Sequence, residues 1–186
     1  MQLRDSRKGS ALLVVLVIGG ILGILFSLGF NTAMKMTSTT EFCVSCHEMD
    51  IPWENFKATA HYENAHGISV DCKDCHIPQE TIPKMIRKVE AAREVWGHWT
   101  GIIDTPEKYA AHRPAMQKRE LDRLRANDSQ ECRNCHEPDR MVLEDQPVAA
   151  QKAHSTLKDS GKTCIDCHNG LAHDAPADEE EMSFEL

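Results

Sequence analysis

Hydrophobic positions along the chain gather in one uninterrupted run near the N-terminus. Residues 11–30 read ALLVVLVIGGILGILFSLGF, with no charge and a single polar side chain, Ser27. A helix of this length rises about 30 Å, the thickness of a bilayer's hydrocarbon core. A cleaved signal peptide is the alternative, but its apolar core is shorter and ends in a small-residue cleavage site, whereas this run leads into NTAMKM. The pattern therefore predicts an uncleaved transmembrane anchor over residues 11–30.

The flanks of this run predict its orientation. Residues 1–10 form a basic segment with Arg4, Arg7 and Lys8, and basic flanks stay in the cytoplasm. Everything after Asn31 then lies on the far side of the membrane. In a bacterium, this describes a single-pass inner-membrane protein with one periplasmic domain.

Beyond the anchor, regular hydrophobic periodicity is sparse. A helical stripe links Ile82, Met85, Ile86, Val89, Trp96 and Trp99, with Pro83 suited to the first turn. Residues 174–186, DAPADEEEMSFEL, are acidic and lack apolar periodicity. This segment is interpreted as a disordered tail, with partner docking as the alternative, which leaves residues 31–173 as the exported domain.

Composition argues against an ordinary protein core. The 186 residues include only 5 Phe, 3 Trp and 2 Tyr, and the anchor and cysteines supply much of the 41% hydrophobic content. Too few large apolar side chains remain to fill a domain interior. The net charge is −8, and residues 1–35 contribute four basic and one acidic residue, or +3, so the remainder carries −11. This acidic balance argues against a nucleic-acid partner.

The eight cysteines occur only as C-x-x-C pairs, and each pair is followed at once by histidine. Two thiols at this spacing add across the two vinyl groups of one haem, and the adjacent histidine is placed under the iron as an axial ligand. The four motifs are Cys43, Cys46 and His47; Cys72, Cys75 and His76; Cys132, Cys135 and His136; and Cys164, Cys167 and His168.

Other uses of paired cysteines fit less well. Disulfide frameworks and zinc ribbons do not require a histidine after every pair, and a thioredoxin-like motif occurs once beside a βαβ pattern. The sequence thus predicts four covalent c-type haems. The fold class follows: an α-rich, irregular multihaem cytochrome c domain with one N-terminal transmembrane helix, in which the haems form the core and folding depends on them.

Motif spacing indicates an internal duplication of a dihaem unit, with a chance match as the alternative. Successive motifs begin 29, 60 and 32 residues apart, at positions 43, 72, 132 and 164. Both second motifs read C-x-D-C-H, and a histidine precedes each of them, His61 by 11 residues and His154 by 10.

Four haems offer eight axial positions, of which the motif histidines fill at most four. His61, His154 and His173 are the candidates for distal ligands, whereas His66, His98 and His112 are interpreted as surface histidines. Met49 follows His47 by two residues, too close to reach the opposite face of a haem that His47 already ligates. If Met49 binds iron it displaces His47; the local sequence fits packing by Met49 equally well. Asp71, Asp74 and Asp166 either tune haem potentials or, more commonly for such residues, cap helices or face solvent.

Five segments together resemble the NapC/NirT family of membrane-anchored tetrahaem quinol dehydrogenases, most of all its NapC branch: STTEFCVSCHEM, HGISVDCKDCH, REVWGHWTGIIDTPEKY, RANDSQECRNCH and KTCIDCHNGLAH. The resemblance implies electron transfer from membrane menaquinol or ubiquinol to a periplasmic reductase, most often nitrate reductase in that branch. It also implies that the first haem lies nearest the bilayer with Met49 as a ligand. Glu94 is then the candidate quinol contact or proton acceptor, the alternative being a solvated helix glutamate. The implied ligand pairs are His76 with His173, His168 with His61, and His136 with His154.

Two other function classes remain open at this point. One is a terminal multihaem reductase acting directly on nitrite or a similar oxyanion, which needs an open iron face and a basic pocket. The other is a non-catalytic haem subunit that anchors a partner. Reduction by quinol without any partner protein distinguishes the quinol dehydrogenase from both.

Overall fold

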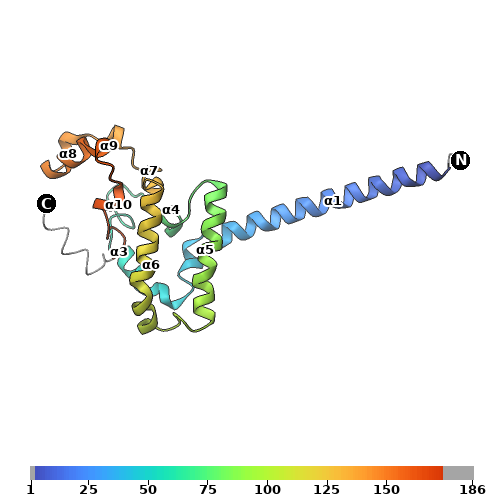
Figure 1. Cartoon of the computed structure of the whole chain (residues 1–186), viewed down its shortest axis with the longest axis horizontal. Helices are drawn as coiled ribbons and strands as arrows, with labels where there is room; N and C mark the ends of the chain where they lie inside the picture. The colour runs from blue at the N-terminus through green and yellow to red at the C-terminus, as the bar shows by residue number, and fades with distance from the viewer. Residues whose placement is uncertain (1–2, 174–186) are drawn as a thin grey trace.

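A long N-terminal helix projects from a helical head in this computed structural model, which describes residues 3–173, with side chains from residue 9 onward (Figure 1). Helix α1 (Leu3–Met36) contains a 28-residue segment, Gly9–Met36, of mean hydropathy 2.9, which is long and apolar enough to cross a membrane. The helix extends beyond the predicted residues 11–30 because the polar flanks on both sides continue the same helical backbone. Its apolar side chains are exposed along its length, as expected of a helix whose surroundings are lipid.

Two long helices, α5 (Thr81–Trp99) and α6 (Pro106–Ala126), run side by side through the head (Figure 1). Helix α5 confirms the predicted helical stripe, and α6 continues through Pro114. The chain returns after α5 so that the Ile103 side chain packs against Gly97, at ordinary van der Waals distance from the position of a Cβ there. The connecting turn then uses Gly101 with φ +73°.

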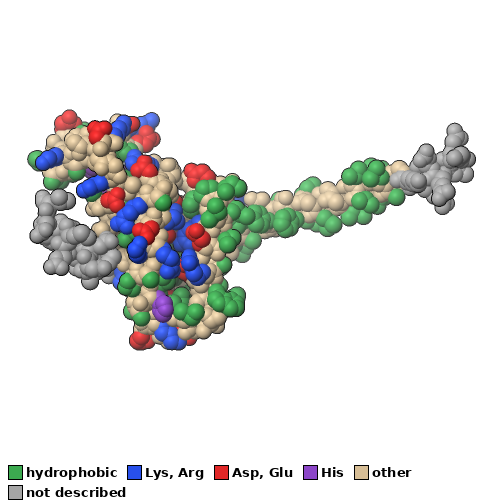
Figure 2. Space-filling view, in the orientation of Figure 1, with side chains coloured by type: hydrophobic (Ala, Val, Ile, Leu, Met, Phe, Trp, Pro, Cys, Tyr) green, Lys and Arg blue, Asp and Glu red, His purple; other side chains and the backbone are tan. Residues whose placement is uncertain are grey.

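The head has a small apolar interior, in agreement with its composition. Among the described residues, the buried hydrophobic side chains are Phe56, Ile103, Tyr109, Leu121 and Leu124. The α5 stripe is largely exposed, and Figure 2 shows its apolar side chains on the side of the head from which α1 leaves. Protein packing alone therefore does not account for this domain, which fits a fold built around large prosthetic groups.

Short helices carry the four cysteine motifs. The first motif spans α2 (Thr40–Cys43) and the 3-10 helix η1 (His47–Met49), the second lies on α4 (Cys72–His76), the third on α7 (Gln130–Arg133) and the residues after it, and the fourth on α10 (Cys164–Cys167). The remaining elements are α3 (Asp50–Lys57), η2 (Pro138–Arg140), η3 (Leu143–Asp145), α8 (Val148–Ser155) and α9 (Leu157–Ser160).

The aspartates of the C-x-D-C-H motifs cap the helices that these motifs begin. Asp74 accepts a 2.8 Å hydrogen bond from the backbone N–H of Asp71, and Asp166 accepts one of 2.7 Å from Thr163. In both cases the acceptor is the third residue of the helix, which satisfies a backbone donor at the N-terminus. The shared cap agrees with the predicted duplication, and it selects the capping alternative for Asp74 and Asp166.

Candidate haem-binding site

The four motifs follow one another in space in the order of the sequence. Helix α2 packs against α4, and α4 packs against α7. The Cys43 thiol hydrogen-bonds Cys72, which raises the pKa of Cys43 and lowers the pKa of Cys72 to about 6. The buried hydroxyl of Ser129, just before α7, accepts a 3.2 Å hydrogen bond from the backbone N–H of Ile165 in the fourth motif. The attachment points therefore form one contiguous series.

Each motif histidine has one other imidazole at nearly the same distance. The ring centres are 5.8 Å apart for His47 and His98, 6.2 Å for His136 and His61, 6.1 Å for His76 and His173, and 5.9 Å for His168 and His154.

These separations are those that two axial histidines require. With metal–nitrogen bonds of about 2 Å and each ring centre roughly 1 Å behind its nitrogen, two imidazoles on opposite faces of one metal have centres about 6 Å apart. Directly stacked or packed imidazoles have no reason to repeat that value four times. The residues present therefore fit covalently attached haem at every motif.

The structure brings all three predicted distal candidates to motif histidines, but with two partners exchanged. His173 lies beside His76, as the resemblance implied. His61 lies beside His136 instead of His168, and His154 lies beside His168 instead of His136. The packing of the helices explains this exchange. Helix α4 packs against α7, so His61, in the segment before the second motif, comes to lie beside the third motif. Helix α8 and its neighbour α9 precede the fourth motif, and His154 on α8 lies beside His168.

Hydrogen bonds orient two of these rings. Nδ1 of His76 donates to Oε1 of Glu120 at 2.9 Å, and Nδ1 of His154 donates to Oε1 of Gln146 at 2.6 Å. An acceptor on Nδ1 fixes the tautomer that leaves Nε2 free for a metal, the usual arrangement of ligand histidines. Burial opposes ionisation of Glu120, but the hydrogen bonds and charges of His76 and Arg123 outweigh it and lower the pKa of the carboxyl.

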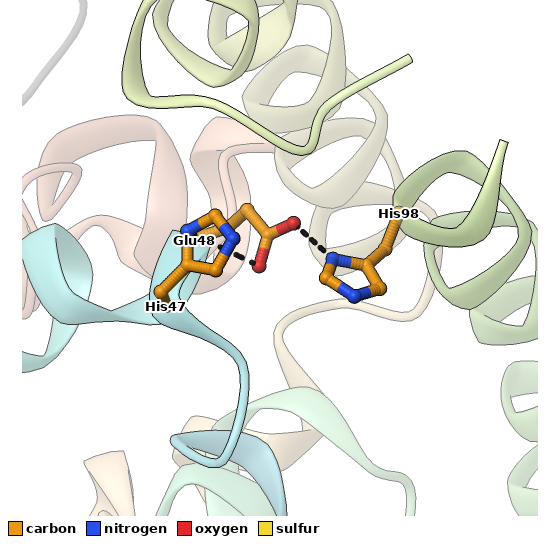
Figure 3. A group of neighbouring side chains, drawn as sticks. All are labelled: His47, Glu48 and His98. Carbon is orange, nitrogen blue, oxygen red and sulfur yellow. Dashed lines mark hydrogen bonds and ion pairs between the residues drawn. The ribbon is translucent and has the colours of Figure 1, made fainter. Parts of the chain in front are cut away.

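The first motif has a comparable arrangement that sequence reasoning missed. The Glu48 side chain is 2% exposed; Oε1 hydrogen-bonds Nδ1 of His98, and Oε2 lies 3.9 Å from Nδ1 of His47 (Figure 3). Burial opposes ionisation of Glu48, yet the hydrogen bond from His98 helps to lower the pKa of its carboxyl. His98 is thus not a surface histidine as predicted. It escaped notice because its partner is 50 residues away in sequence and because it lies off the apolar stripe of α5.

The remaining candidates divide between surface and site. His66 and His112 are exposed, as predicted, and Nδ1 of His112 donates to the backbone carbonyl of Lys108 at 2.9 Å. Glu94 is half-buried one turn before His98 on α5; Oε1 is 3.6 Å from Nη2 of Arg119, and its buried Oε2 has no hydrogen-bond partner in the described part of the chain. Met49 is half-buried at the end of η1.

Comparison with known proteins decides the family. Residues 5–178 match the model of the NapC/NirT cytochrome c family, N-terminal region. The chain belongs to the NapC/NirT cytochrome c family. Cytochrome c-type protein NapC of Escherichia coli K12 is 47% identical over 167 residues, which cover 89% of this chain and 84% of that protein. Denitrification system component NirT of Stutzerimonas stutzeri is 47% identical over 163 residues, covering 87% and 81%. A putative tetrahaem cytochrome c of Allochromatium vinosum is 40% identical over 179 residues, covering 96% of each.

The family and the four motifs together make this chain a membrane-anchored tetrahaem electron-transport cytochrome. The fold class predicted from sequence is confirmed, including the single apolar N-terminal helix. Residues 174–186, predicted to be a disordered tail, lie outside the described residues.

Proposed function

We propose that this cytochrome oxidises menaquinol or ubiquinol at the membrane and delivers the electrons to a periplasmic reductase, with periplasmic nitrate reductase as the preferred partner. The observation that carries the proposal is the order of the motifs relative to α1. Helix α1 ends at Met36 and the first motif begins at Cys43, so the first site adjoins the anchor. The other three follow contiguously away from it, which suits transfer from bilayer to solvent.

The chain's own residues would hold four haems. The eight motif cysteines would form the thioethers, and the pairs His76 and His173, His136 and His61, and His168 and His154 would supply axial nitrogens. His47 and Met49 are the first site's candidates from sequence. When bound, the haems supply one-electron chemistry, which suits division of a quinol's electron pair.

The anchor's surroundings support a quinol site near the first motif. Lys88 on α5 donates a 3.0 Å hydrogen bond to the hydroxyl of Thr37, directly after α1, so α5 is held against the membrane end of the head. Trp96 and Trp99 are 63% and 76% exposed on this helix, and tryptophan favours the membrane–water interface. A lipid-dissolved donor would meet this face first.

Glu94 is the proposed proton acceptor. Oxidation of a quinol releases two protons with its two electrons, and a carboxylate next to the donor can take a proton from its hydroxyl. The buried Oε2 of Glu94 has no other partner among the described residues, while Arg119 holds the second oxygen. Glu94 thus offers one uncommitted acceptor atom on the helix that faces the anchor.

Orientation follows from the charges before α1. Arg4, Arg7 and Lys8 favour a cytoplasmic N-terminus and a periplasmic haem domain in the bacterial inner membrane. The resemblance to the NapC branch supports nitrate reductase as the acceptor.

The decisive experiment uses the full chain in detergent, without oxygen and without any partner. Addition of menaquinol or ubiquinol analogues is expected to give the absorbance change of haem reduction, and Glu94→Gln is expected to slow it about a hundredfold, the lower end of the range of general-base contributions. Glu90→Gln, on an exposed glutamate one turn earlier on α5, is the matched control. Reduction by dithionite but not by quinol would contradict quinol oxidation.

Acceptor specificity is tested separately with the prereduced cytochrome. We expect rapid reoxidation by periplasmic nitrate reductase plus nitrate and slow reoxidation by nitrite or nitrate alone. Reoxidation by nitrite alone would instead identify a terminal reductase.

A further inference from the structure

We propose that His98 is the distal axial ligand of the first haem, on the face opposite His47, and that the buried carboxylate of Glu48 positions it. This inference rests on the haem assignment above and is independent of which donor reduces the protein. It keeps His47 as a ligand, whereas Met49, the ligand that the resemblance implied, would displace His47.

The first argument is the recurring distance between imidazoles. His47 and His98 have ring centres 5.8 Å apart, against 5.9 to 6.2 Å for the other three pairs. The distance from His98 to the histidine of the first motif thus matches the distances from His61, His154 and His173 to the histidines of the other motifs. If the latter are distal ligands, the same geometry assigns the same role to His98.

The second argument is the hydrogen bond on the far nitrogen. Nδ1 of His98 meets the Glu48 carboxylate (Figure 3). In the same way, Nδ1 of His76 meets Glu120 and Nδ1 of His154 meets Gln146. This bond commits Nδ1 and leaves Nε2 as the available metal ligand. A carboxylate that is only 2% exposed also anchors the ring, because an unpaired carboxylate is unfavourable when buried.

The third argument concerns reach. Met49 follows His47 by two residues within one 3-10 helix, η1, so the two side chains cannot approach opposite faces of one haem. His98 comes from α5, on a different part of the chain, and can therefore oppose His47. With both histidines as ligands, His47 need not be displaced, and Met49 is left to pack against the site.

A metal ion other than haem iron is the competing occupant of this cluster. Ligand-type atoms of His47, Glu48 and His98 all lie within 4.8 Å of one another. Such an ion would need the Glu48 oxygens as ligands, whereas haem ligation uses Glu48 only as the hydrogen-bond acceptor of His98. Variants of Glu48 therefore separate the two possibilities.

The test uses the full-length holoprotein in detergent and counts haem spin states by low-temperature magnetic circular dichroism and electron paramagnetic resonance. The wild type is expected to have four low-spin haems, each with two nitrogen ligands. His98→Ala should convert one haem in four to high spin, and added imidazole should restore the low-spin signal. His98→Met should keep that haem low spin but give the charge-transfer band of thioether ligation.

One control and one further test variant accompany these variants. His112→Ala removes an exposed histidine and should change no haem signal. Glu48→Gln, which keeps an acceptor for Nδ1, should retain four low-spin haems and shift the reduction potential of one, whereas loss of a non-haem ion would appear as loss of one metal equivalent in elemental analysis.

Three results would overturn the proposal: a high-spin haem already present in the wild type and unaltered by His98→Ala, loss of a thioether band in Met49→Leu, or a non-haem metal bound in the wild type and lost in Glu48→Gln. A protein that passes the spin-state test yet is not reduced by quinol contradicts only the proposed function.

Discussion

Nη1 of Arg123 donates a 2.6 Å hydrogen bond to Oε1 of Glu131, a carboxylate whose side chain is only 1% exposed. The same guanidinium donates from Nη2 to the backbone carbonyl of Cys75 at 2.9 Å and bonds Glu120, which in turn holds His76. Glu131 precedes Cys132 of the third motif. A single side chain on α6 therefore ties the second motif to the third, using the planar donor array that only arginine provides.

Replacing Arg123 should destabilise the head strongly. In Arg123→Met, Glu131 keeps its buried charge without the cation that pairs with it, while Glu120 retains His76 and Arg87. Breaking a buried ion pair in this way costs about 3–5 kcal/mol. We expect a clearly lower guanidinium chloride midpoint for the holoprotein, followed through the absorbance of its haems, and a lower yield of fully loaded protein.

The matched control for that variant is Arg140→Gln. Arg140 is 80% exposed and, among the described residues, forms an ion pair only with Glu137, so the midpoint should move by no more than the equivalent of about 0.5 kcal/mol. Equal shifts in the two variants would show that Arg123 does not link the motifs.

Glu120 should set the reduction potential of the second haem through His76. A carboxylate on Nδ1 pushes electron density toward the ligating nitrogen and favours oxidised iron. Glu120→Gln keeps an acceptor but removes the charge, so one midpoint potential should rise by up to about 60 mV, the equivalent of about 1.4 kcal/mol for a one-electron couple. Spectroscopic redox titration measures this shift, and Glu144→Gln in η3 should leave all potentials in place. If all four midpoint potentials were unchanged in Glu120→Gln, Glu120 would not set the potential of the second haem.

The parts of this fold that could be predicted from sequence are those specified by local chemistry. The apolar run predicts α1 because lipid requires continuous apolar side chains, and each C-x-x-C-H motif needs no distant residue to be recognised. Ring partners are different, because they depend on which helices pack together. The sequence predicts His61 and His154 as distal ligands, but the structure places each beside the motif histidine expected for the other, since nothing near either histidine records the packing of α4 against α7.

His98 illustrates the same limit more strongly. Its neighbours in sequence suggest a polar face of an amphipathic helix, and only folding brings it to Glu48 and His47. Helix α6 begins at a cap by Thr105 and continues through Pro114, a residue that ordinarily interrupts a helix. Sites built from charged or metal-ligating residues that are distant in sequence therefore cannot be predicted from hydrophobic periodicity.

Asp74 should stabilise the second motif by capping α4. Removing its side chain in Asp74→Ala leaves the backbone N–H of Asp71 without its 2.8 Å acceptor, and the loss of such a cap costs about 1 kcal/mol. The thermal midpoint of the holoprotein should fall by a few degrees. Asp139→Ala is the control, since Asp139 is 73% exposed and, within residues 9–173, forms an ion pair only with an exposed lysine. A midpoint equal to that of the wild type would mean that the attached haem alone fixes this turn.

Helix α1 should tolerate no charge near its middle. Leu22 is 60% exposed in the centre of the apolar segment, where only lipid would surround it. Arginine at the centre of a membrane helix costs about 2.5–3.5 kcal/mol on insertion, so Leu22→Arg should shift the cytochrome out of the carbonate-resistant membrane fraction or reduce its accumulation. Ile68→Arg places the same charge on an isoleucine that is 65% exposed in the head, and it should leave membrane association intact. If both variants fractionated like the wild type, α1 would not be what holds the cytochrome in the bilayer, and the first motif would have to approach the membrane through the apolar face of α5 instead.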